Sequence, residues 1–362
     1  MKNYLDHRII YQSIKLKKNR LNWYFNIIRL SFILVVIISF SRCNSSGGKE
    51  NSEKQQKLLS SITDSSLDSA SDSNKYIVIM PTHSIVSFQY DLDNPDERYV
   101  LPGSLTEISG LAYYKENKIL CVQDEKAIIY VYNLDKKEIE SEYDFGKDGD
   151  YEGITLSGQT AYVIRSDGNI FEVESFDEKD RKVKEYKTLL SAKNDAEGLT
   201  YDKLSNSLFI ACKGSPSVEK EKPYEGYKAI YQFDLEKMIL DKEPNFLVDL
   251  NRLDSYKNDD LFKEFSLRIA KKLQLIESGT SFQPSGLAIH PIHDEIYLLS
   301  NTGKMLIILD RQGRVMDVQD LNIKISRQPE GICFSPSGDL FISNEGDGGK
   351  GYILKFNLHT NE

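Results

Sequence analysis

Tryptophan, histidine and cysteine are scarce in this sequence, and the shortages of histidine and cysteine each argue against a class of functional site. Among 362 residues there are one Trp, five His and four Cys. Three of the cysteines, Cys121, Cys212 and Cys333, stand singly inside apolar, strand-like segments without C-x-x-C spacing, which argues against a disulfide framework or a zinc site. We expect them to be buried thiols that pack as small apolar groups.

Motifs for nucleophilic catalysis and phosphate binding are also missing. The sequence has no G-x-S-x-G elbow, and its few histidines do not assemble with Ser and Asp into a convincing catalytic set. The Gly-rich segment 346–351 lacks the spacing and the Ser or Thr of a phosphate loop, so we predict a hairpin connection there. His290 and His293 could form a metal-binding pair, but they fall between two predicted strands, and a solvated turn is the favoured interpretation.

The body of the chain has too little positive charge to bind nucleic acid. The formal charge is −9, yet residues 1–43 hold eight Lys and Arg against one acid, which leaves −16 for residues 44–362. Such a body repels phosphate backbones, and it has no basic stripe interleaved with aromatic residues. We therefore expect no nucleic-acid partner.

The apolar run that follows the basic leader is too short for an ordinary membrane-spanning helix. It covers residues 30–41, 12 residues, which suits the core of a signal peptide. Cys43 follows at once, and this order resembles a bacterial lipoprotein signal, which implies lipid attachment at Cys43. An uncleaved anchor over 21–41 and simple secretion are the alternatives. All three place the body outside the cytoplasm, in the cell envelope or at the cell surface.

Composition divides the chain into three parts: the leader 1–43, a segment 44–75 and a body 76–362. The segment 44–75 is rich in Ser, Asn, Asp, Lys and Gln and has almost no aromatic or β-branched residues. Such a segment cannot bury enough apolar surface to fold. We predict a disordered tether with an r.m.s. span on the order of 30 Å.

A short motif returns along the body at nearly fixed intervals. It is centred on a glycine at positions 110, 153, 198, 286 and 331, with steps of 43, 45, 88 and 45 residues. Each repeat contains about four short segments of strand-like content separated by turn residues. The second repeat gives 153–156, 160–165, 169–174 and 183–190, with a hairpin turn at Ser166-Asp167-Gly168. A period in the forties with four strands per unit predicts an all-β propeller.

The third repeat is longer, and the last is incomplete. The extra length of the third includes residues 255–278, whose apolar residues recur at helical spacing, so we predict one helical insertion near 255–278. The last repeat supplies only three strands before the chain ends. Residues 76–80, 86–92 and 98–101 are available to complete it, which gives five blades, with a sixth blade built from 76–101 as the alternative.

The repeat motifs resemble those of a known family. They read LPGSLTEISGLAY (101–113), GDYEGI (149–154), AEGLTYD (196–202), PSGLAIHP (284–291) and PEGICFSPSGDLFISNE (329–345). This pattern is similar to that of the SdiA-regulated family of bacterial envelope β-propellers. The resemblance implies a propeller in the cell envelope and a metal site, with calcium as the expected ion. It implies no reaction.

Acidic residues at one repeat position are the candidate metal ligands. Glu152, Glu197 and Glu330 each precede the repeat glycine, and a ring brings equivalent positions toward one channel. Three converging carboxylates repel one another unless a cation or protons intervene. Calcium prefers such oxygens together with amide oxygens, here those of Asn301 and Asn344. The alternative is that each Glu accepts backbone hydrogen bonds from a neighbouring blade. Asp124, Asp167 and Glu345 follow second strands and are expected at one channel mouth.

Two classes of function fit this sequence. The first is a binding or scaffold module, tethered to the membrane, whose partner is an unknown protein or small-molecule ligand. The second is a metal-dependent hydrolase of an ester, lactone or phosphoester, in which an axial ion polarises the substrate. The missing nucleophile and base favour the first, and no catalytic residue is assigned.

Overall fold

The computed structural model describes residues 88–115, 117–219, 224–250, 253 and 282–359. The predicted leader, the tether and the helix predicted near 255–278 lie outside the described residues. Within the described residues, no helix has the length and apolar character needed to cross a membrane.

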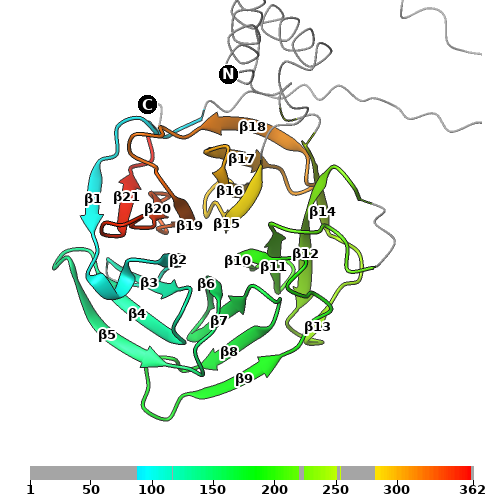
Figure 1. The fold of residues 1–362 in the computed structure, drawn as a ribbon, viewed down its shortest axis with the longest axis horizontal. Helices are drawn as coiled ribbons and strands as arrows, with labels where there is room; N and C mark the ends of the chain where they lie inside the picture. The colour runs from blue at the N-terminus through cyan, green and yellow to red at the C-terminus, as the bar shows by residue number, and fades with distance from the viewer. Residues whose placement is uncertain (1–87, 116, 220–223, 251–252, 254–281, 360–362) are drawn as a thin grey trace, which may run out of the picture. The chain divides into compact units, whose positions relative to one another are not determined.

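Five antiparallel sheets stand around a common centre, with their first strands innermost (Figure 1). Blade 1 consists of β2 (Ile108–Tyr113), β3 (Lys118–Gln123), β4 (Ile128–Asn133) and β5 (Glu138–Asp144). Blade 2 consists of β6 (Tyr151–Ser157), β7 (Thr160–Arg165), β8 (Ile170–Glu174) and β9 (Lys182–Tyr186). Blade 4 consists of β15 (Gln283–Ile289), β16 (Ile296–Thr302), β17 (Met305–Leu309) and β18 (Val315–Asp320).

Blade 3 has a divided outer edge. Its inner strands are β10 (Ala196–Asp202), β11 (Ser207–Cys212) and β12 (Tyr227–Asp234). Two short strands, β13 (Ile239–Leu240) and β14 (Phe246–Asp249), pair with different ends of β12. The sequence pattern predicts a strand over 245–250, which matches β14, whereas β13 was not predicted.

Blade 5 closes the ring with strands from both ends of the body. It consists of β19 (Pro329–Phe334), β20 (Leu340–Asn344), β21 (Tyr352–Phe356) and β1 (Glu97–Val100), which pairs antiparallel with β21 and places Glu97 opposite Lys355. A short 3-10 helix, η1 (Gly103–Leu105), then leads into blade 1. The predicted five blades and the closure by residues 98–101 are confirmed, and the six-blade alternative is wrong.

The repeat glycines mark the points where neighbouring inner strands come closest. A Cβ added to Gly110 would lie 2.8 Å from the Cα of Gly153, and one added to Gly153 would lie 2.9 Å from the carbonyl oxygen of Glu197. At Gly331 the added Cβ would meet the carbonyl oxygen of Ser109 in blade 1. The contacts therefore run around the whole ring and return to its start, and only glycine fits at each of them.

The hydrophobic core is divided among the spaces between blades. Each of five buried clusters draws residues from two neighbouring blades, for example Ile119 and Cys121 of blade 1 with Phe341 and Ile353 of blade 5. Cys121, Cys212 and Cys333 are all buried and unpaired, which confirms the predicted thiols. The outermost strands face solvent with alternate residues, as in β5.

Residues 88–92 are not a strand, although the sequence suggested one over 86–92. They are held by side chains instead. Tyr90 is buried, and its Oη donates to the carbonyl of Gly338 at 2.6 Å. His290 lies 2.8 Å from the same Oη through Nε2, while its Nδ1 accepts the backbone N–H groups of Ile292 and His293 at 3.2 and 3.0 Å.

These contacts correct the interpretation of the turn at 290–294. Because Nδ1 is an acceptor, Nε2 carries the proton and donates to Tyr90. His290 is only 1% exposed, so it is a buried clasp and not a solvated turn residue. We call Tyr90, His290 and Gly338 the Tyr90 clasp.

Candidate functional site

Acidic side chains collect at one end of the central channel. In every blade the first strand begins, and the second strand ends, at the same face, because the two strands are antiparallel neighbours. Side chains just before the repeat glycine and just after the second strand therefore meet there. We call this end the acidic mouth; its charged residues include Glu107, Asp124, Asp150, Glu152, Asp195, Glu197, Lys213, Lys304, Glu330 and Glu345.

The position before each repeat glycine forms an inner ring. Its members are Ser109, Glu152, Glu197, Ser285 and Glu330. The two serines donate to backbone carbonyls of the next blade, Ser109 to Tyr151 at 2.6 Å and Ser285 to Pro329 at 2.8 Å. The hydrogen bonds that link neighbouring inner strands at this position thus come from the serines.

The glutamates of the inner ring have side-chain partners. Glu197 is buried and its Oε1 lies 2.7 Å from the Nζ of Lys213. Glu330 accepts from the Nδ2 of Asn301, whose own Oδ1 accepts from Lys304. Glu152 and Glu197 line a cavity of about 10 Å³ at the channel axis, room for about one water.

Burial and mutual repulsion raise the pKa of these carboxyls. Burial, reinforced by Glu197 and Asp150, holds the pKa of Glu152 well above its usual range. Burial together with the charges of Glu197 and Glu345 raises the pKa of Glu330 to about 8. Burial also raises the pKa of Glu197, although the Lys213 ammonium opposes it. The inner ring therefore carries carboxyls that need protons or a cation to stay together.

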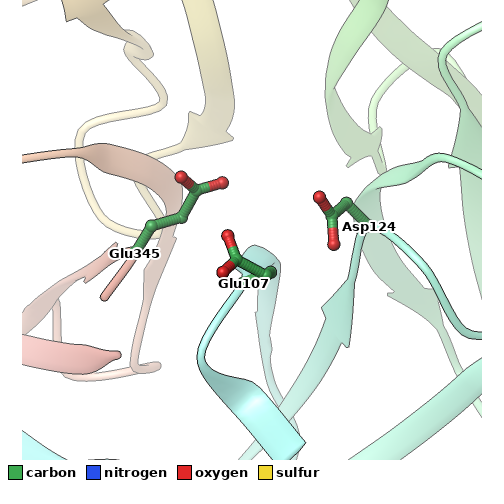
Figure 2. Close-up of side chains that lie close together, drawn as sticks. All are labelled: Glu107, Asp124 and Glu345. Atoms are coloured by element: carbon green, nitrogen blue, oxygen red, sulfur yellow. The ribbon is translucent and has the colours of Figure 1, made fainter. Parts of the chain in front are cut away.

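A second group of carboxylates lies where blade 1 meets blade 5. Glu107 precedes β2, Asp124 follows β3 and Glu345 follows β20, and Figure 2 shows the three side chains converging. Carboxylate oxygens of all three lie within 4.8 Å of one another. Burial and the charge of Glu107 raise the pKa of Asp124 to about 6 and that of Glu345 to about 7. We call this group the seam cluster.

The sequence indicated part of the seam cluster. Asp124 and Glu345 were expected at a channel mouth, whereas Glu107 was missed. The signal for Glu107 was present, because it stands three residues before the repeat glycine, as do Asp150 and Asp195 in the next two repeats. Asp167, expected at the same mouth, is held in a bidentate contact with Arg165 at 3.1 and 2.8 Å.

Several buried polar atoms near the mouth have no hydrogen-bond partner among the described residues. They are Oδ1 of Asp124, Oε1 of Gln328 and both amide atoms of Asn344, a wholly buried residue. Gln328 stands three residues before Gly331, and its carbonyl accepts the N–H of Glu345 at 2.9 Å. Unpaired acceptors of this kind are costly unless a water or an ion meets them.

The opposite end of the channel is lined without charged side chains. A cavity of about 150 Å³ lies there among residues that follow the repeat glycines, including Leu111, Leu199, Thr155 and Thr200. The channel is thus acidic at one end and uncharged at the other.

A sequence model of the SdiA-regulated family matches residues 83–347, which include all five inner strands. The chain belongs to the SdiA-regulated family. The predicted family is therefore confirmed. No curated protein matches the sequence.

This SdiA-regulated propeller is also similar to solved structures, at low identity. The glutaminyl cyclase of Myxococcus xanthus is 12% identical over 74% of this chain and 97% of that chain, with a TM-score of 0.45. A virginiamycin B lyase from Staphylococcus aureus is 14% identical over 73% and 74%, with a TM-score of 0.37. Likenesses this distant support no argument about activity.

The mouth of the SdiA-regulated chain suits a cation. It offers carboxylate and amide oxygens, the donors that hard ions such as calcium prefer. Lys213 places one ammonium beside Glu197, and Lys304, which donates to Asn301, places a second near Glu330 and Glu345. The acids of the mouth still outnumber these positive charges.

Proposed function

We propose that this chain is an exported propeller, tethered to a membrane of the cell envelope through its N-terminal segment, that acts as a binding or scaffold module. The leader with Cys43 and the polar segment 44–75 motivate export and tethering. The acidic mouth is the proposed binding site. Its excess of buried and half-buried carboxyls, whose pKa values are raised, is the single observation that carries the proposal.

Calcium is the proposed cation of the mouth. Glu152, Glu197 and Glu330 would supply carboxylate oxygens on the channel axis, and Asn301 and Asn344 would supply amide oxygens. Asn344 suits this role because its buried amide has no hydrogen-bond partner within the part of the chain that the structure describes. For Asn301 to bind an ion, its Oδ1 would have to exchange Lys304 for the ion. A bound divalent ion would neutralise the ring and offer an electrophilic centre to an anionic or carbonyl ligand.

One observation favours a hydrolase as the second candidate. The pKa values of Glu330 and Glu345, about 8 and about 7, lie near neutrality, where a carboxyl can accept and donate protons. In that case the ion would polarise an ester, lactone or phosphoester oxygen, and one of these carboxyls would act on the attacking water.

Two experiments test the proposal. Metabolic labelling with a fatty acid, followed by membrane fractionation, should label the wild-type chain and fail with Cys43→Ser; equal labelling of both would contradict lipid tethering at this residue. Elemental analysis of the purified chain and thermal melts with calcium and with a chelator test the ion.

The variant Glu197→Gln separates the two candidate functions. If Glu197→Gln lowers the melting temperature and neither the wild type nor the variant hydrolyses the test substrates, the binding module is supported. Loss of a measured ester, lactone or phosphoester hydrolysis with an unchanged melting temperature supports the hydrolase.

A further inference from the structure

We propose that residues 88–93 are a releasable strap, which latches the chain onto the junction of blades 4 and 5 and detaches from it in acid while the ring stays closed. This property goes beyond the proposed binding function, since it concerns how the propeller is joined to the chain before it. It depends on the contacts of the strap and not on the acidic mouth or on lipid attachment.

The strap lies outside the sheets that close the ring. Ring closure is complete at β1, which begins at Glu97 and pairs with β21 over four positions. Residues 88–92 form no strand. Among the described residues, a single backbone hydrogen bond joins them to a distant part of the chain, from the N–H of His359 to the carbonyl of Gln89 at 3.0 Å. Release of the strap therefore breaks no strand pairing.

The Tyr90 clasp is the anchor of the strap. Tyr90 is buried in the apolar cluster between blades 4 and 5. Its ring packs edge-on against Tyr297 of blade 4 and lies beside Phe334 of blade 5, with centroids 6.5 and 6.2 Å apart. Its Oη bonds to His290 of blade 4 and to the carbonyl of Gly338 in blade 5. One side chain thus joins the strap to both blades.

Two weaker contacts hold the ends of the strap. The Oε1 of Gln89 lies 2.8 Å from the Nε2 of His293, in the turn after β15. At the other end, the Oδ1 of Asp93 accepts from the Nδ2 of Asn322, in the loop between β18 and β19, at 3.0 Å. Both contacts are exposed, so water competes for them. The buried contacts of Tyr90 therefore decide whether the strap stays in place.

His290 makes this anchor sensitive to pH. Its Nδ1 accepts the N–H groups of Ile292 and His293 while its Nε2 donates to Tyr90, so the buried ring cannot take a second proton and keep these bonds. Burial and the charge of His293, whose ring stacks on that of His290 at 4.6 Å, lower the pKa of His290 from 6.5 to about 4. Release of Tyr90 opens the Nε2 side to water, and the pKa then returns toward 6.5.

The other titratable groups around the anchor give His290 no counterion. Asp339, in the turn after β19, is paired with Lys355 at 3.4 Å. Burial raises the pKa of Glu295, so exposing this carboxyl opposes release in acid, and the effect of His290 must be measured against a variant that keeps Glu295. The remaining groups come from the strap, blade 4 and the C-terminal segment, and they are Tyr90, Asp91, His293, Tyr297, Asp317 and His359.

Acid favours release because the released form binds a proton more readily than the latched form. With a pKa of about 4 when latched and 6.5 when released, His290 raises the equilibrium constant for release about 50-fold between pH 7 and pH 4.5. Release frees residues 88–93 and lengthens the chain that leads into β1 by up to roughly 20 Å. The reach of the propeller from any point of attachment before residue 88 then grows by that length.

Thiol labelling of the full chain tests the release. In a Cys43→Ser background, Leu92→Cys puts a thiol at a strap position that is 7% exposed, while the buried Cys212 of blade 3 reports on opening of the ring. The reagent is a pyridyl disulfide, which reacts with thiols in acid as well as at neutral pH. Between pH 7 and pH 4.5, labelling at position 92 should rise about 50-fold more with His290 than with His290→Gln, and Cys212 should stay unlabelled.

Two further variants complete the test. Tyr90→Phe keeps the ring and loses both bonds at Oη, so it should raise labelling at position 92 about fivefold already at pH 7. Phe88→Cys, at a partly buried strap position, replaces Leu92→Cys if that variant does not fold.

Two results would overturn the proposal. If position 92 and Cys212 are labelled at the same rate at pH 4.5, the strap leaves only when the ring itself unfolds. If labelling has the same pH dependence with His290 and with His290→Gln, protonation of His290 does not release the strap. Neither result bears on lipid attachment, which the labelling with fatty acid decides separately.

Discussion

Acidification should loosen the Tyr90 clasp. His290 is buried, and burial together with the nearby charge of His293 lowers its pKa from 6.5 to about 4. The unfolded chain therefore binds a proton at this residue at a higher pH than the folded chain does. The free energy of unfolding contributed by His290 consequently falls as the pH drops from 6.5 toward 4.

The size of this loss follows from the shift in pKa. A difference of 2.5 pKa units corresponds to about 3 kcal/mol in full, and between pH 7 and pH 4.5 roughly 2 kcal/mol of it is lost. A protonated Nδ1 can no longer accept the N–H groups of Ile292 and His293, which is the structural source of the loss.

The assay is denaturant unfolding of the wild type and of His290→Gln at pH 7 and pH 4.5. Glutamine offers one acceptor and one donor but does not titrate, and it leaves the neighbouring titratable groups, Tyr90, His293, Glu295 and Asp339, in both proteins. Carboxyls with raised pKa values, such as Glu330, stabilise the folded chain as the pH falls, and they cancel in the comparison. The wild type should lose roughly 2 kcal/mol more than the variant. An equal change in both proteins would refute the argument.

Further predictions concern the ring itself. Gly198→Ala places a Cβ 2.8 Å from that of Leu287 and should lower the free energy of unfolding by about 1–3 kcal/mol in a denaturant titration. Gly103→Ala is the control: nothing lies within 4 Å of its added Cβ, so the free energy of unfolding should change by less than about 0.5 kcal/mol. Ser109→Ala removes the hydrogen bond that links Ser109 of blade 1 to the Tyr151 carbonyl of blade 2, and should lower the free energy of unfolding by about 1 kcal/mol in the same assay. An unchanged midpoint would show that this bond does not stabilise the ring. In a Cys43→Ser background, the buried thiols, such as Cys212, should react with a thiol reagent only after denaturation; rapid reaction of that native variant would show that they are accessible.

The sequence predicted the ring well because one steric requirement repeats in it. Neighbouring inner strands approach so closely that the same position must be glycine in each blade, and the residues around it repeat with it. The spacing of those glycines therefore counted the blades, and the shortage of strands in the last repeat identified the closure. The divided edge of blade 3 was only half predicted, since β13 is two residues long and leaves no periodic pattern.

The candidate site was less predictable, because its contacts join residues far apart in the chain. Glu107 and Glu345 come from opposite ends of the body, and nothing local to either shows that they meet. The sequence suggested that glutamates accept backbone N–H groups of a neighbouring blade. The inter-blade side-chain contacts at this position instead come from serines, whose short side chains donate to backbone carbonyls of the next strand. His290 looked like a solvated turn residue because its partner, Tyr90, lies 200 positions away.

The pairing of β1 with β21 also constrains how the protein is made. Glu97 and Lys355 are 258 positions apart, so a chain emerging from the ribosome lacks the partner of β1 until β21 has been synthesised. During that interval blades 1 to 4 form an open ring. The apolar faces of blade 1 and blade 4 that blade 5 will cover are then exposed to solvent. Premature termination before β21 would leave both faces open at once. Such a truncated product is a ready substrate for aggregation and for quality-control proteases.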